Sequence, residues 1–173
     1  MPSDFDLLNQ LFGSGVYTEP ARLRADDLLV RSRAQQPLER ASALLRDVAV
    51  RYQHDVVPPA SRSQPFPDPA TIAPMRRADQ ARARISECHD AIRGLTVPAA
   101  DHVWNRHRQP TPLLNLLVAT DRLLIYQCDR VLEALQGLTV TSLATFDWTA
   151  LEASLAELCQ AIESRRRLTR LDL

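Results

Sequence analysis

Apolar residues recur at steps of three and four along several long segments of this chain, and this spacing constrains the fold more than any other feature. The clearest case is segment 111–136, where one helical face carries Leu114, Leu117, Leu124, Cys128, Val131 and Leu135. Such a stripe is typical of an amphipathic α-helix that buries one side. Similar stripes run through 37–56, 74–95 and 147–169, so the sequence predicts an all-α protein.

Turn-forming residues divide these stripes into elements. A helix is expected from about residue 18 to 35, and Pro37 marks either a kink in it or the start of a new helix. A short helix is expected at 99–108. Gly137 is expected to end the helix at 111–136, and Asp147 is a candidate N-cap for the last helix. The sequence therefore predicts a four- to five-helix up-down bundle.

A proline-rich stretch, 58–74, separates the second and third predicted helices. It holds six prolines in seventeen residues, which argues against helix there. We expect an extended connector long enough to cross the bundle from end to end, and a proline-rich partner motif is the alternative. With an N-terminal arm at 1–17, the whole chain 1–173 is predicted to form one domain.

Composition narrows the class of protein. The 21 basic residues, all arginine, balance 21 acids, so no net charge draws the whole chain to nucleic acid or membrane. Three widely spaced cysteines do not form a disulfide pattern and fit a reducing compartment. The start lacks the pattern of a signal peptide, and no apolar run approaches the ~20 residues of a membrane span. We expect a cytoplasmic protein with no membrane partner.

Asp121 is the least expected residue of the apolar stripes. It lies in the middle of the most hydrophobic one, and a buried carboxylate needs a charged or hydrogen-bonding partner. One interpretation is a ligand-binding or proton-handling group inside the bundle. The favoured alternative is a structural pair with Arg or His that fixes the helix register, because no second carboxylate lies at bundle-metal spacing.

Two arginine clusters are candidates for contacts with nucleic-acid phosphates. The first is Arg76, Arg77, Arg82 and Arg84, and the second is Arg165, Arg166 and Arg167. The favoured alternative for both is a solvated surface. For the second cluster the reason is that cations near a helix C-terminus are stabilised by the macrodipole. The first cluster lies near a helix start, where the macrodipole does not explain it.

Histidine and cysteine offer two further interpretations. The string Arg84-Ile-Ser-Glu-Cys-His89 resembles the Arg-x4-His motif of HEPN ribonucleases, although Ile85 replaces the polar residue that often follows the arginine. The resemblance implies RNA cleavage by Arg84 and His89 in a dimer. The three cysteines with His89 are an alternative zinc set, but buried free thiols are more common, so neither a metal nor a cofactor is expected.

The function is thus predicted mainly from what the chain lacks, since we find no phosphate loop or hydrolase motif. The leading hypothesis is a non-enzymatic helical module that binds a protein partner or associates with itself. Trp104 is a candidate contact residue within 99–108. The alternatives are a small nucleic-acid-backbone-binding subunit of a nucleoprotein complex and a HEPN-like ribonuclease.

Overall fold

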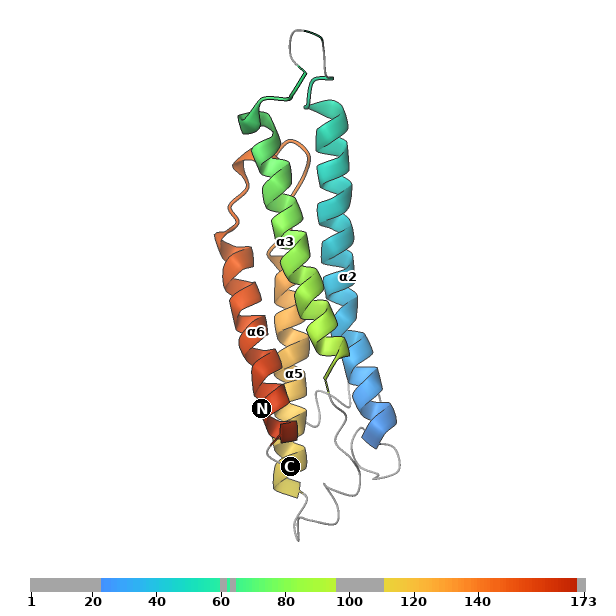
Figure 1. The fold of residues 1–173 in the computed structure, drawn as a ribbon. Helices are drawn as coiled ribbons and strands as arrows, with labels where there is room; N and C mark the ends of the chain where they lie inside the picture. Colours follow the sequence, from blue (N-terminus) through green and yellow to red (C-terminus); the bar gives the residue numbers. More distant parts are fainter. Residues whose placement is uncertain (1–22, 60–61, 63–64, 96–110, 171–173) are drawn as a thin grey trace.

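The computed structural model describes residues 23–59, 62, 65–95 and 111–170. Its elements are α2 (Leu23–Asp55), α3 (Pro69–Arg93), α5 (Thr111–Glu133), the short 3₁₀ helix η2 (Leu143–Thr145) and α6 (Thr149–Arg170). The described residues contain no strand, and the four long helices lie side by side in one bundle (Figure 1). The predicted all-α helical bundle is confirmed.

The helices alternate in direction along the chain but do not follow one another around the bundle. Going round it, α2 contacts α3, α3 contacts α6, α6 contacts α5, and α5 contacts α2 (Figure 1). The antiparallel hairpins α2–α3 and α5–α6 therefore pack against each other with α2 parallel to α5 and α3 parallel to α6. Consequently α2 and α6 lie diagonally across the bundle, and a polar contact between them must pass through the core.

The core runs along the bundle axis and is made by the predicted stripes. Its fully buried large side chains include Leu38, Leu45, Ile85, Ile92, Leu124, Leu135, Leu143 and Leu151. Burying each of these side chains stabilises the fold by about 1.5–3 kcal/mol relative to leaving it exposed. Trp148, directly before α6, is buried and packs edge-on against Phe146.

Prolines interrupt the helices less than the sequence suggested. Pro37 lies buried inside α2, so the two helices expected on either side of it are one continuous helix. The loss of one backbone hydrogen bond is tolerated because the flanking Ala34 and Leu38 are fully buried. Of the two interpretations of Pro37, a fresh helix start is excluded.

The prediction that 58–74 is a non-helical crossover is wrong at its second half. Helix α3 begins at Pro69 and includes Pro74. A proline fits the first position of a helix because an N–H group there would have no intrahelical acceptor, so its absence costs no hydrogen bond. The carbonyl of Asp68 accepts hydrogen bonds from the N–H groups of Thr71 and Ile72 at 3.0 and 3.2 Å. Because α2 and α3 are antiparallel neighbours, the connector joins adjacent helix ends and does not cross the bundle (Figure 1).

In the second hairpin, α5–α6, the helix ends lie close to the positions predicted from the sequence. Helix α5 ends at Glu133, three residues before the expected end, and Gly137 follows with φ +82° in the left-handed region. The Asp147 carboxylate accepts a 2.9 Å hydrogen bond from the Thr149 N–H, which confirms it as the cap of α6 and lowers its pKa below 3.8. The arm at 1–17 and the helix expected at 99–108 lie outside the described residues.

Candidate functional site

Three buried charged side chains meet where α2, α5 and α6 converge. Arg165 of α6, Asp27 of α2 and Asp121 of α5 are each 1% exposed. The Arg165 Nε donates to Asp121 Oδ1 at 2.6 Å, and its Nη2 donates to Asp27 Oδ1 at 2.6 Å. One guanidinium thus connects α6 to its neighbour α5 and to the diagonal helix α2. Charge-assisted bonds this short are the strong kind.

Arg31 extends this cluster to the fourth helix. Its Nε lies 2.9 Å from Asp27 Oδ2, as an ion pair without the alignment of a hydrogen bond. Its Nη1 donates to the carbonyls of Arg93 and Leu95 at 3.1 and 3.0 Å, where α3 ends. Carbonyls in the last turn of a helix have no intrahelical partner, so this cation satisfies them. We call Asp27, Arg31, Asp121 and Arg165 the buried ionic cluster.

The pKa of Asp27 shows how the cluster is balanced. Burial raises this pKa above the ordinary 3.8, the Arg165 guanidinium opposes that shift, and the nearby Asp121 carboxylate adds to it. Arg31 also lowers it, through its charge and its contact with the carboxylate. Desolvation therefore outweighs the two arginines, as is common for buried ion pairs.

The surroundings of Asp121 bear on its two interpretations. Its carboxylate is buried and bonded to an arginine, which is the structural pair that the sequence favoured. Arg165 was grouped with Arg166 and Arg167 as a surface cation, and that interpretation is wrong because it occupies the core. Asp27 was missed, although it lies one helical turn before the buried Val30 and so continues the stripe of α2.

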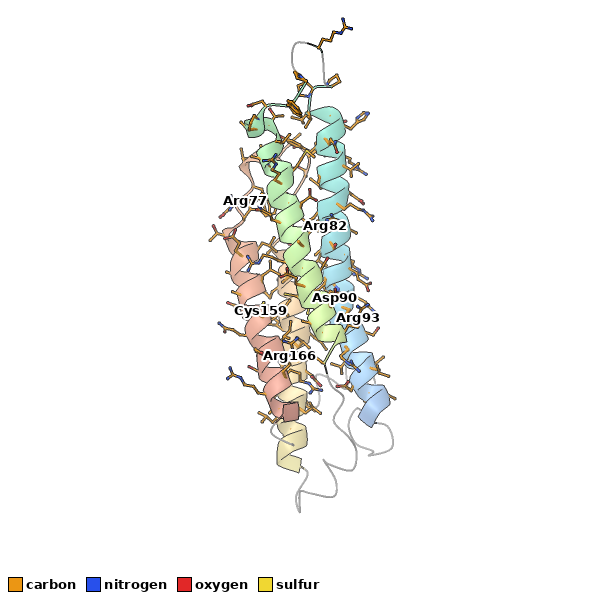
Figure 2. All side chains as sticks on the ribbon, viewed as in Figure 1. Arg77, Arg82, Asp90, Arg93, Cys159 and Arg166 are labelled. Carbon is orange, nitrogen blue, oxygen red and sulfur yellow. The ribbon has the colours of Figure 1, made fainter. Side chains whose placement is uncertain are left out.

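The arginines of α3 do not form one patch. Figure 2 shows Arg77 on the side of α3 toward α6 and Arg82 on the side toward α2. Arg77 pairs with Glu152 at 3.4 Å and lies over the Trp148 ring at 5.8 Å. Arg84 lines the same α3–α6 groove, of about 100 Å³, whereas Arg82 lines a different groove between α2 and α3.

The remaining surface arginines are dispersed too. Arg76 is exposed, and Arg82 pairs with Asp79 at 3.5 Å. On α6, Arg166 pairs with Glu163 at 3.9 Å, and Arg167 is exposed. Each run of arginines is thus interleaved with acids, which reduces the local positive field that a phosphate backbone would meet.

His89 lies away from Arg84. It lines the α2–α3 groove, which has a volume of about 290 Å³, and its ring nitrogens lie 3.5 Å from Glu39 and 3.5 Å from Asp90. Arg84 faces the α3–α6 groove instead, so the Arg84–His89 pair does not form one site within a single chain. The arginines that share the groove with His89 are Arg46 and Arg82.

Two of the three cysteines are in contact. The Sγ atoms of Cys88 on α3 and Cys159 on α6 are 3.7 Å apart, with Cys88 buried and Cys159 exposed. Burial raises the pKa of Cys88 to about 12, the Cys159 thiol adds to the shift, and the Arg84 charge opposes it. Cys128 is fully buried on α5, and burial raises its pKa as well. Within the described ranges, no three His, Cys, Asp or Glu residues are grouped as metal ligands.

The outward side of α5 carries large apolar side chains. Leu116, Leu123 and Tyr126 are 50%, 45% and 55% exposed. Their spacing of seven and three places them along one helical face, beside the buried face that carries Leu117, Leu124 and Cys128. We call Leu116, Leu123 and Tyr126 the α5 outer stripe. Trp104, the contact residue expected from the sequence, lies outside the described residues.

The helices that the structure describes form a bundle of two antiparallel hairpins, α2–α3 and α5–α6, joined by the buried ionic cluster. Comparison of the chain with protein-family models, with curated proteins and with solved structures finds no match. Among the helices the structure describes, none combines the length and the apolar character needed to cross a membrane.

Proposed function

We propose that this chain is a non-enzymatic interaction module that associates through the α5 outer stripe. The observation that carries the proposal is the exposure of three large apolar side chains on one face of a helix whose other face is fully packed. Such contiguous apolar exposure is typical of docking surfaces, whereas single exposed apolar residues are ordinary. The arginines of α3 divide between two grooves, so a phosphate-binding function has less support.

The proposed occupant of the stripe is a second copy of the chain. In an antiparallel pairing about a two-fold axis, Leu123 of one molecule meets Tyr126 of the other, so these two residues form a self-complementary centre of the interface. Arg130 and Glu133, which pair at 3.6 Å at the end of the stripe, bring both signs of charge to the rim. A like-charge clash therefore does not oppose this pairing.

Sedimentation velocity over a concentration series tests the proposal. We expect the 19.4 kDa chain to shift toward twice that mass as concentration rises, and Leu123→Glu to remain monomeric. A buried carboxylate in the dimer interface is unfavourable, whereas the monomer already exposes this position. Val50→Glu is the matched control, because Val50 is 59% exposed on α2 and lies outside the stripe. A wild-type chain that stays monomeric throughout, or association unaffected by Leu123→Glu, would refute it.

A further inference from the structure

The contact between Cys88 and Cys159 joins residues that are 71 positions apart in sequence and belong to different hairpins. At 3.7 Å the two sulfur atoms are already at van der Waals contact, and a disulfide bond requires them to approach to about 2.05 Å. Cys159 lies on α6 halfway along the bundle, at the seam with α3 (Figure 2). The pair is independent of the α5 outer stripe.

The two thiols differ in access. Cys159 is exposed and can meet a dissolved oxidant, whereas Cys88 is 5% exposed and Cys128 is fully buried. Thiol oxidation follows exposure and thiolate character, and a sulfenic acid persists only when no second thiol is near. The arrangement therefore has an outer thiol that reacts first and an inner thiol positioned to react with the product.

We propose that Cys159 and Cys88 form a peroxide-reactive thiol pair, with Cys159 as the thiol that peroxide oxidises and Cys88 as the resolving thiol. The Cys159 thiolate attacks one oxygen of hydrogen peroxide, forming an S–O bond as the O–O bond breaks. The leaving hydroxide takes up a proton and becomes water. Cys88 then attacks the Cys159 sulfur, the S–S bond forms, the S–O bond breaks, and a second water leaves. Two thiols lose two electrons in total, and the peroxide is reduced by the same two.

Arg84 supports the second step. It lies one helical turn before Cys88 on the face of α3 that meets α6, and its charge lowers the pKa of Cys88 against the effect of burial. The resolving thiol reacts as its thiolate, so a nearby cation raises the reactive fraction. Arg84 is thus a positioning residue that acts through Cys88. This gives a role to an arginine that the sequence placed in a phosphate-binding cluster.

The experiment uses the reduced full-length chain, hydrogen peroxide as the oxidant, and intact-mass measurement with non-reducing peptide mapping. We expect the wild type to lose the mass of two hydrogen atoms and to yield one cross-linked peptide pair, Cys88 with Cys159. Cys128→Ser is the matched control and should form the same bond. Cys159→Ser should form none, and Cys88→Ser should instead gain oxygen on Cys159. Because Cys159 is exposed, its replacement by serine leaves the fold intact.

A quenched time course isolates the role of Arg84. Arg84→Gln should slow disulfide formation several-fold while the first oxidation of Cys159 keeps its rate, since only the resolving thiolate loses its neighbouring cation. Equal rates of disulfide formation in the two proteins would overturn the role of Arg84. Three intact thiols after peroxide treatment, oxygen on Cys159 without the cross-link, or cross-links only between molecules would overturn the pair itself.

Discussion

Replacement of Arg165 by methionine tests the reasoning about the buried ionic cluster most directly. The substitution removes the one guanidinium that both Asp27 and Asp121 contact at 2.6 Å, and it keeps an unbranched apolar side chain in the same space. Two carboxylates then remain in the core with one cation fewer. Removing one partner of a buried ion pair is strongly destabilising, because the remaining charge keeps its desolvation penalty.

The magnitude follows from that penalty. Breaking a buried pair costs about 3–5 kcal/mol, a large part of the 5–15 kcal/mol that stabilises a typical domain. With a urea slope of about 2 kcal/mol/M, the unfolding midpoint should fall by about 2 M. Arg167→Met is the control on the same helix, and because Arg167 is exposed its effect should stay within about 0.5 kcal/mol.

The assay is urea unfolding followed by circular dichroism at neutral and at acidic pH. Because the folded-state pKa of Asp27 lies above 3.8, its contribution is most favourable at low pH and is lost as the pH rises through that folded pKa. Arg165 lowers this pKa, so its removal raises it further, and the deficit of Arg165→Met should shrink on acidification. A loss below about 1 kcal/mol at neutral pH, or a deficit that grows in acid, would refute the reasoning.

Two further predictions concern the chain's covalent and backbone constraints. Oxidation of Cys88 and Cys159 closes a loop spanning 71 positions, so the chain-entropy relation predicts a stabilisation of about 4 kcal/mol, measured as a higher urea midpoint for the oxidised than for the reduced protein. Coincident unfolding curves would contradict it. Gly137→Ala should lower the stability by about 1 kcal/mol in the same assay, because φ is +82°, in the left-handed region that alanine disfavours. The added Cβ meets no atom within 4 Å, so no steric clash adds to this cost. An unchanged midpoint would show that the backbone relaxes there without strain.

The stripes allowed the helices to be predicted, because one face of each long segment is packed in the core. Prolines misled the prediction at Pro69 and left it open at Pro37, since the position of a proline in a helix and the packing around it decide its cost. The order of helices around the bundle was not predictable in the same way. Two hairpins with similar apolar stripes can pack in more than one arrangement, and complementarity between distant residues selects among them.

Part of the buried ionic cluster is visible in the sequence as charged residues that interrupt apolar stripes. Asp121 was found because it interrupts a stripe, and Arg165 interrupts another in the same way, three positions after the buried Ile162. Its two arginine neighbours made the run look like a surface cluster, because local charge was weighed before helical phase. When three helices each carry a charged residue on their apolar face near the same end of a bundle, these residues are expected to pair with one another. The Cys88–Cys159 contact had no such signal, since it depends on which helices are neighbours.

The cluster also explains how one arrangement of the hairpins is selected. Arg165 can satisfy Asp27 and Asp121 together only when α2, α5 and α6 come close at this end of the bundle, as they do in the observed order. Any arrangement that separates these helices leaves charges buried without partners, which the apolar stripes alone would not penalise. We therefore expect the cluster to contribute more to the uniqueness of the fold than to its stability.

Replacing the three most deeply buried side chains of the cluster separates these two contributions. In the triple variant Asp27→Leu, Asp121→Leu, Arg165→Met, these three charges leave together, while Arg31 keeps its hydrogen bonds to the carbonyls of Arg93 and Leu95. The free energy of unfolding should therefore equal or exceed that of the wild type by about 1–4 kcal/mol, in contrast to Arg165→Met alone. If the cluster selects the arrangement, the amide ¹H–¹⁵N spectrum of the triple variant should show doubled or broadened resonances while the wild type gives a single sharp set. A single sharp set from a stable triple variant would mean that apolar packing alone already specifies which hairpin faces are neighbours, and the cluster would then be dispensable for the fold.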